Sequence, residues 1–288
     1  MQLKKSERKQ VKLRLGLSGA SGFGKTKSAL LLAYGMTNDW SKIAVIDTEN
    51  SSASLYSDVG NFNVIDLTAP YSPERYIEAI ELCEKSNILV IIIDSISHEW
   101  NGTGGCLDIH EKLGGRFQDW AIITPRHQAF IDKILNSTCH IITTVRRKID
   151  YSMESDMNGK SKVVKHGTKE ITREGFEYEL TVNFELINDK HLVRASKDRT
   201  SLFANKPEFI ITSATGKRIL DWCNVKPTSL KEMLDKIEGT LSISELTKLY
   251  NENPSYQATL KTQFMEKKTH LEGLTNQQNF SSNGNNHL

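Results

Sequence analysis

Short apolar runs alternate with segments of helical pattern through the first 150 residues. Apolar and polar residues alternate over residues 11–18, whereas Ile43–Asp47 and residues 88–94 are almost continuously apolar. Alternation is typical of a half-buried strand, and a short continuous run is typical of a strand buried on both faces. A further strand is predicted over residues 140–145, and helices from Lys25 to about Met36, over Pro73–Lys85 and over residues 125–135. This order predicts an α/β fold with a mostly parallel central sheet.

The character of the sequence changes after residue 150. Residues 150–173 are polar and contain glycine and many lysines, which favours a flexible loop. Two segments after this loop, 176–186 and 191–195, look like an antiparallel pair of strands. Helical patterns then return at residues 230–237, 242–251 and 256–271. We therefore predict a flexible basic N-terminus (1–10), a core (11–225), a small C-terminal helical appendage (226–272) and a disordered polar tail (273–288).

Composition excludes several classes of protein. The chain has 288 residues, of which 38% are hydrophobic and 25% charged, and its net charge is only +2. The longest apolar run is too short to cross a membrane, and the first residues lack the apolar segment of a secretory signal. The four cysteines, Cys83, Cys106, Cys139 and Cys223, are scattered without metal-binding spacing. We expect a cytoplasmic protein that has no membrane partner.

Residues 19–26 match the phosphate-binding motif G-x-x-x-x-G-K-[ST] in full. They follow a predicted strand and open a predicted helix, which is the context that the motif requires. Backbone N–H groups of such a loop point at phosphate oxygens. Lys25 should reach the β- and γ-phosphates of ATP, and the Thr26 hydroxyl should bind Mg²⁺. The predicted nucleotide-binding residues are Gly19, Ser21, Gly22, Gly24, Lys25, Thr26 and Lys27.

Two further acidic positions complete a candidate hydrolytic site. Asp94 ends the most apolar strand, where a protein with a phosphate-binding loop needs a carboxylate to support Mg²⁺. Ser95 follows it in place of glutamate, so the carboxylate that activates water must come from elsewhere. Glu49 and Glu99 are the two candidates, and Glu49 is preferred because it follows a strand end.

The ordered set of motifs resembles the RecA-type ATPase core over about residues 10–225. It comprises the phosphate loop, Asp-Thr-Glu at 47–49, Asp-Ser at 94–95, Thr-Thr-Val-Arg-Arg-Lys at 143–148 and Ser-Lys-Asp-Arg-Thr at 196–200. More narrowly, it resembles phage-encoded AAA-family ATPases of recombination and replication modules. The resemblance implies a RecA-like P-loop fold with an antiparallel extension of the sheet, and a phage or prophage gene expressed in a bacterial host.

The resemblance also implies roles for individual residues. Glu49 would polarise the attacking water, and Thr144 stands where the family has a polar sensor of the γ-phosphate, usually glutamine. Lys197 and Arg199 match cationic fingers that a neighbouring subunit inserts beside the γ-phosphate. Hydrolysis would then depend on assembly into a ring or a filament, a choice that the sequence leaves open.

The predicted loop after residue 145 is the candidate DNA-binding segment. Residues 146–173 hold eight basic residues against four acidic ones. Such a segment could contact phosphates without sequence preference, although a solvated surface hairpin is the alternative. The basic N-terminal stretch up to Arg14 could add a DNA or subunit contact. The predicted DNA contacts are Arg146, Arg147, Lys148, Lys160, Lys162 and Lys165.

Together these features predict an ATPase that uses Mg²⁺-ATP and acts on single-stranded DNA in phage recombination or replication. A single-strand-binding protein or another recombination protein is a possible partner of the appendage. The alternatives are a ring helicase or loader-type motor, and a nucleotide-dependent annealing or interaction module that hydrolyses ATP weakly. The sequence leaves open whether the nucleic acid is DNA or RNA.

Overall fold

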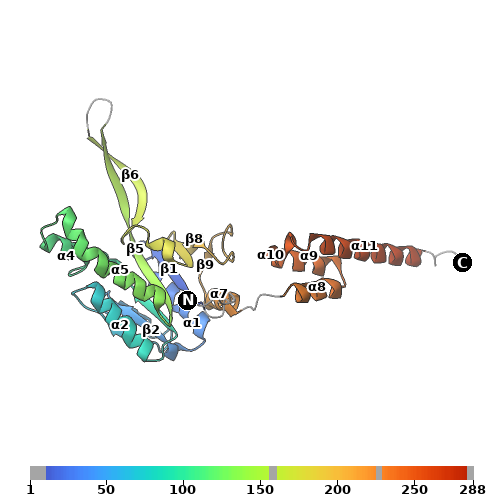
Figure 1. Cartoon of the computed structure of the whole chain (residues 1–288), viewed down its shortest axis with the longest axis horizontal. Helices are drawn as coiled ribbons and strands as arrows, with labels where there is room; N and C mark the ends of the chain where they lie inside the picture. The colour runs from blue at the N-terminus through green and yellow to red at the C-terminus, as the bar shows by residue number, and fades with distance from the viewer. Residues whose placement is uncertain (1–10, 156–160, 225–228, 284–288) are drawn as a thin grey trace. The chain divides into compact units, whose positions relative to one another are not determined.

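The computed structural model describes residues 11–155, 161–224 and 229–283, and residues 1–10 lie outside it. Within that part, nine strands form one sheet in the order β3-β2-β4-β5-β1-β7-β8-β9, with β6 paired to β5 (Figure 1). The strands are β1 (Arg14–Gly19), β2 (Ile43–Asp47), β3 (Asn63–Asp66), β4 (Val90–Asp94), β5 (His140–Ser155), β6 (Ser161–Glu170), β7 (Val182–Leu186), β8 (Leu192–Asp198) and β9 (Phe209–Ile210). Strands β3 to β7 in this order are parallel, and β8 and β9 extend the sheet antiparallel. The predicted α/β class and the antiparallel extension are confirmed.

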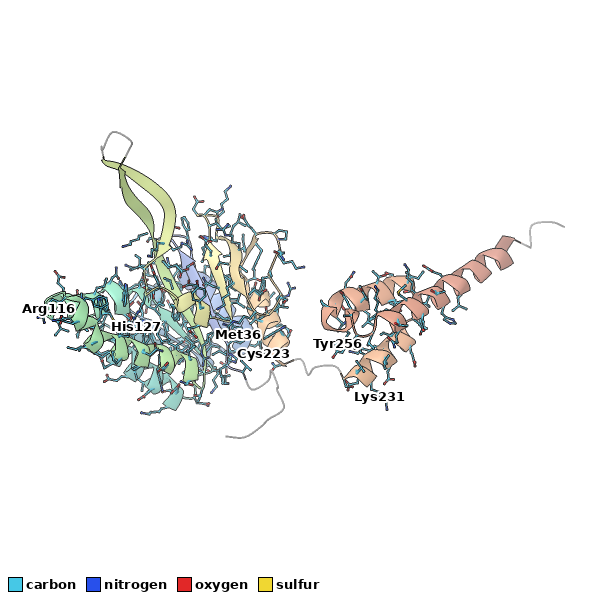
Figure 2. The ribbon with its side chains drawn as sticks, turned by 45° about the horizontal axis from the view of Figure 1, so that its top comes forward. Met36, Arg116, His127, Cys223, Lys231 and Tyr256 are labelled. Atoms are coloured by element: carbon cyan, nitrogen blue, oxygen red, sulfur yellow. The ribbon has the colours of Figure 1, made fainter. Side chains whose placement is uncertain are left out.

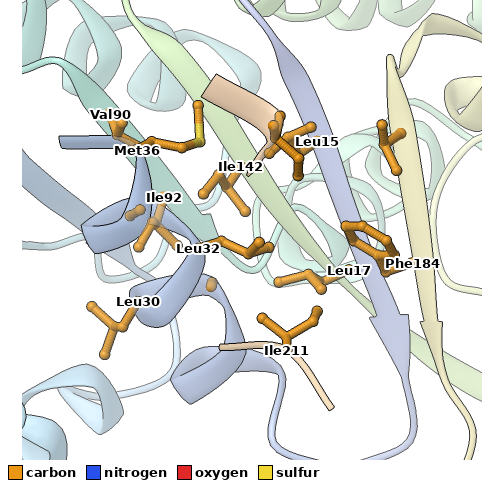
Figure 3. Close-up of a cluster of buried hydrophobic side chains, with 14 of the residues drawn as sticks. Leu15, Leu17, Leu30, Leu32, Met36, Val90, Ile92, Ile142, Phe184 and Ile211 are labelled. Carbon is orange, nitrogen blue, oxygen red and sulfur yellow. The ribbon is translucent and has the colours of Figure 1, made fainter. Parts of the chain in front are cut away.

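Helices cover both faces of the sheet. On one face lie α1 (Lys25–Thr37) and α7 (Ser213–Asn224), and on the other lie α2 (Pro73–Lys85) and α5 (Trp120–Asn136). Side chains of a strand alternate between these faces: in β2, Ile43 and Val45 pack toward α1, whereas Ala44 and Ile46 pack toward α2. Figure 3 shows part of the cluster on the first face, where Leu30 and Leu32 of α1 lie among apolar residues of β1, β4, β5 and β7.

Several predicted boundaries change. The strand predicted from residue 176 begins at Val182, because Phe176–Glu179 form the short helix α6. The helix predicted over residues 125–135 begins five residues earlier, at Trp120. Three elements were not predicted from the sequence: strand β3 and the short helices α3 (Ser97–Asn101) and α4 (Cys106–Lys112). These elements are only four to seven residues long, so their apolar pattern is too short to stand out.

The flexible loop predicted over residues 150–173 is wrong in its main part. β5 continues through Ser155 and pairs antiparallel with β6, so the two strands form a ribbon that extends beyond the sheet (Figure 1). The sequence of this segment is rich in polar residues and lacks the regular apolar alternation that predicts a strand. Residue Lys160 lies outside the described part of the chain.

The second compact unit begins at Lys226. It contains α8 (Leu230–Gly239), α9 (Ile243–Glu252), α10 (Pro254–Gln257) and α11 (Lys261–Asn283) around a small core that includes Met233, Leu246 and Phe264. Residues 273–283, which the sequence assigns to a disordered tail, are helical, and no proline interrupts them. Among the described helices, none is both long and apolar enough to span a membrane.

Arg14 is a structural residue rather than part of an exposed basic terminus. Its side chain is 4% exposed and donates hydrogen bonds to the carbonyl oxygens of Leu135, Ser137 and Cys139 at 2.8–2.9 Å. Burial lowers the pKa of its guanidinium to about 10. Arg14 therefore satisfies the carbonyls at the end of α5 and joins them to β1.

Gly216 allows α1 and α7 to pack closely. A Cβ atom at this position would lie 2.1 Å from the backbone oxygen of Leu32. Alanine usually stabilises a helix relative to glycine, but here we expect Gly216→Ala to lower the free energy of unfolding by about 1–3 kcal/mol through overpacking. Urea unfolding of the variant and the wild type measures this change in the free energy of unfolding. The control is Lys217→Ala, which removes only a surface pair with Asp221 and should cost at most about 0.5 kcal/mol; equal effects would contradict the packing argument.

Candidate nucleotide-binding site

The phosphate loop joins β1 to α1 at the carboxyl edge of the parallel sheet. Gly19 is the last residue of β1, and Lys25 is the first residue of α1. Gly22 and Gly24 have φ angles of 81° and 90°, a region that favours glycine. These two glycines give the loop its curl. Ser21 and Lys27 are exposed beside it.

Lys25 folds back over the loop. Its Nζ donates to the carbonyl oxygens of Gly19 and Ala20 at 3.1 and 2.9 Å. Burial lowers the pKa of Lys25, and the charges of Asp94 and Glu49 oppose that shift. The ammonium group is thus held inside the loop, where it can exchange these carbonyls for phosphate oxygens.

Asp94, the last residue of β4, connects helix α1 and strand β5 at this edge. Its Oδ2 accepts a hydrogen bond of 2.5 Å from Thr26, and its Oδ1 accepts one from Thr144. Burial raises the pKa of Asp94, although both hydrogen bonds oppose that effect. The Thr26 hydroxyl and the Asp94 carboxylate are oxygen ligands of the kind Mg²⁺ uses, so these residues fit a metal bound together with ATP. Thr144, the predicted phosphate sensor, makes its hydrogen bond to Asp94.

Glu49 lies in a turn that follows β2. Asp47, the last residue of β2, accepts hydrogen bonds from the backbone N–H groups of Glu49 and Ala53 at 2.6 and 2.7 Å. The Glu49 carboxylate forms an ion pair with Arg146, whose Nε lies 2.7 Å from Oε1. Burial favours a higher pKa for Glu49, but Arg146 and Lys25 outweigh it and hold the pKa below its ordinary value. Glu49 is therefore an ionised, positioned carboxylate beside the phosphate loop.

Glu99, the other candidate base, points away from this edge. It is 1% exposed, and its carboxylate accepts a hydrogen bond from the Cys106 thiol and lies 3.0 Å from the imidazole Nδ1 of His127. Its partners lie on α4 and α5 rather than on the phosphate loop. This geometry favours Glu49 over Glu99 as the group that contacts water.

His191 contacts the phosphate loop, although the sequence did not predict it as a residue of this site. It lies in the turn between β7 and β8, with φ 61°, and its Nδ1 is 2.8 Å from the carbonyl oxygen of Phe23 in the phosphate loop. A Cβ on Gly24 would lie 2.7 Å from the same nitrogen. The turn therefore braces the loop, a contact between residues far apart in the sequence.

Lys197 and Arg199 lie far from the phosphate loop of their own chain. Lys197 pairs with Asn183, which lies beside Gly16, and Arg199 follows the end of β8 near the start of β1. Their side chains donate to the carbonyl oxygen of Tyr178, and Lys197 also to that of Glu177. Both cations therefore cap the end of α6.

The residues predicted to contact DNA lie in different environments in the structure. Arg146 is bound by Glu49, and Arg147 forms ion pairs with Glu170 and Glu185. Lys148 is exposed, and Lys162 and Lys165 lie on β6 at positions paired with Glu154 and Tyr151. The two arginines thus belong to ion pairs at the base of the ribbon.

A groove of about 820 Å³ lies beside the base of the ribbon. Its aromatic residues are Trp100 and Trp120, which stack with ring centroids 5.7 Å apart, and Phe117, which is 92% exposed. Its basic residues are Lys148, Lys169 and Arg173. The sequence alone did not predict this groove, because no local pattern links the two tryptophans to the lysines.

The comparisons with known proteins agree with this geometry. A family model described as an AAA domain matches residues 11–221, which cover the sheet, the phosphate loop and the acidic residues around it. None of the curated proteins matches the chain. AAA domains are nucleotide-binding ATPase domains built on the phosphate loop. On the match and the fold together, the chain belongs to the AAA domain family of P-loop ATPases.

Proposed function

We propose that the protein is a Mg²⁺-dependent ATPase that acts on single-stranded DNA in phage recombination or replication, and that a neighbouring subunit completes its hydrolytic site. The observation that carries the proposal is the ion pair between Glu49 and Arg146. Arg146 lies beside Gly19 in the sheet and begins the segment of β5 that continues into the ribbon. One contact thus joins the nucleotide site to the candidate DNA surface.

The chain's own residues supply most of the chemistry of hydrolysis. Lys25 and the loop N–H groups bind the phosphates, and Glu49 orients water for in-line attack on the γ-phosphate. Asp94 holds the Thr26 hydroxyl in place. Bound Mg²⁺ would neutralise charge on the β- and γ-phosphates. Arg146 is paired with the Glu49 carboxylate, so a DNA phosphate that attracts Arg146 would free Glu49 to orient water. The rate of hydrolysis would then depend on bound DNA.

The groove supports the choice of a single-stranded partner. Bases of a single strand stack on exposed aromatic rings, and lysines and arginines bind the phosphates that join them. Phe117 offers such a ring, and the half-buried, mutually stacked Trp100 and Trp120 line the groove beside it. Lys148 and Arg173 lie on the same groove. Duplex DNA hides the faces of its bases, so this arrangement favours a single strand.

Phe117→Ala should weaken binding of an oligo(dT) strand by about 5- to 150-fold, because stacking of one base contributes about 1–3 kcal/mol. Phe117 is 92% exposed, so its loss should leave the fold intact. Fluorescence anisotropy of a labelled strand measures the affinity. Leu55→Ala, at a residue that is 81% exposed and outside the groove, is the matched control. Equal affinities of the two variants would contradict the role of the groove.

The test of the whole proposal is the ATPase rate with and without single-stranded DNA, at low and high salt and over a range of protein concentrations. We expect DNA to stimulate hydrolysis, salt to remove the stimulation, and the rate per chain to rise cooperatively with concentration. A rate indifferent to DNA would overturn the DNA partner and leave an ATPase. DNA binding and annealing without turnover of ATP would instead indicate the alternative function, a nucleotide-dependent annealing or interaction module.

A further inference from the structure

A buried cluster outside the nucleotide site brings together three side chains that bind metals. Glu99 comes from α3, Cys106 is the first residue of α4, and His127 lies on α5 in the core unit (Figure 2). One ligand atom from each lies within 4.8 Å of the others, and all three residues are at least 95% buried. The proposed hydrolytic mechanism uses none of these residues.

We propose that Glu99, Cys106 and His127 form a zinc site that fastens α3 and α4 to α5. A thiolate, an imidazole nitrogen and a carboxylate oxygen together form a ligand set that suits Zn²⁺ rather than Mg²⁺. In a tetrahedral zinc site, neighbouring ligand atoms are about 3.3–3.7 Å apart. Here the Cys106 Sγ and the His127 Nδ1 each lie 3.0 Å from Glu99 Oε1, so small outward shifts admit the ion.

Charge balance supports a divalent ion at this position. Among the described residues, the ion-pair partner of Glu99 is His127, and neither Lys nor Arg pairs with it. Zn²⁺ would displace the thiol proton to solvent and leave a neutral unit of Zn²⁺, thiolate, carboxylate and imidazole, so the buried ion would add no net charge to the core. A water molecule or a neighbouring group would complete the coordination.

The position of the cluster suggests what the ion stabilises. α3 begins three residues after Asp94, and α4 follows it through glycines at 102, 104 and 105. Both helices are short, at five and seven residues, and isolated helices of this length are unstable in water. A metal bound by both helices and by α5 would hold Trp100 and Leu107 in the groove in one arrangement.

The experiment measures metal directly on the full-length protein. Purified after growth with zinc and dialysed, the wild type should retain about one zinc per chain by elemental analysis, and Cys106→Ser should lose most of it. Cys139→Ser is the matched control, because Cys139 is also buried but its thiol contacts the Ile88 carbonyl oxygen. Retention of zinc by Cys106→Ser, or its absence from the wild type, would overturn the proposal.

Cobalt substitution tests the same site in the folded wild type, so the result does not depend on a variant that folds poorly. It also distinguishes metal bound by Cys106 from metal bound at the nucleotide site. Co²⁺ added to metal-free wild type should give a thiolate-to-cobalt charge-transfer absorption, which the Asp94 site cannot produce because it contains no cysteine. The same absorption should appear in Cys139→Ser. A cobalt spectrum without that band in the folded wild type would show that Cys106 is not a ligand.

Discussion

A Glu49→Gln protein should bind ATP almost as well as the wild type and hydrolyse it about 10²- to 10⁴-fold more slowly. Glutamine keeps the size of the side chain and can still accept a hydrogen bond from Arg146, so the turn after β2 should persist. It lacks the negative charge that orients and polarises water. Single-turnover hydrolysis and nucleotide titration measure the two properties separately.

The control for charge loss is Glu78→Gln, an exposed glutamate on α2 that should change the rate little. Glu99→Gln gives the second comparison, because the Glu99 carboxylate lies among Cys106 and His127 rather than beside the phosphate loop. Full activity of Glu49→Gln, together with loss of activity in a folded Glu99→Gln protein, would reverse the assignment of the base.

Replacing Lys197 and Arg199 together with alanine should lower turnover by about 10³-fold or more while ATP binding stays nearly intact. Arg199 lies near the start of β1, away from the phosphate loop at its end. Lys197 is level with Gly16, three residues or about 10 Å before Gly19. We therefore expect their charges to act on the phosphate loop of another subunit, and the loss should be greatest at concentrations where the wild type assembles.

A mixing experiment separates this role from capping of α6. The double variant has an intact phosphate loop, and a Lys25→Ala chain has intact fingers. If Lys197 and Arg199 act on a neighbouring subunit, the two inactive proteins should regain turnover when mixed. Some interfaces then bring the intact phosphate loop of the double variant together with Lys197 and Arg199 of the Lys25→Ala chain. Each protein at the same total concentration is the control. Absence of recovery, with both proteins folded and assembled, would contradict catalysis across the interface.

The sequence by itself determined the phosphate loop and most of the sheet. Residues 19–26 and the strands ending at Asp47 and Asp94 carry local signals: fixed spacing, glycines in a left-handed conformation and continuous apolar runs. Such signals survive without tertiary contacts, since they depend on neighbours within a few residues. The edge at which these strand ends meet then follows from parallel pairing.

Only the tertiary structure decided which polar side chains meet. Arg146 pairs with Glu49 across 97 residues, His191 reaches the phosphate loop across 168, and His127 joins Glu99 across 28. No local pattern encodes such contacts, because they arise when the sheet and its helices fix distant residues in register. The same holds for the ribbon and the groove. Their side chains are polar or aromatic in isolation, and become a candidate surface only when β5, β6 and the helices around Trp100 are packed together.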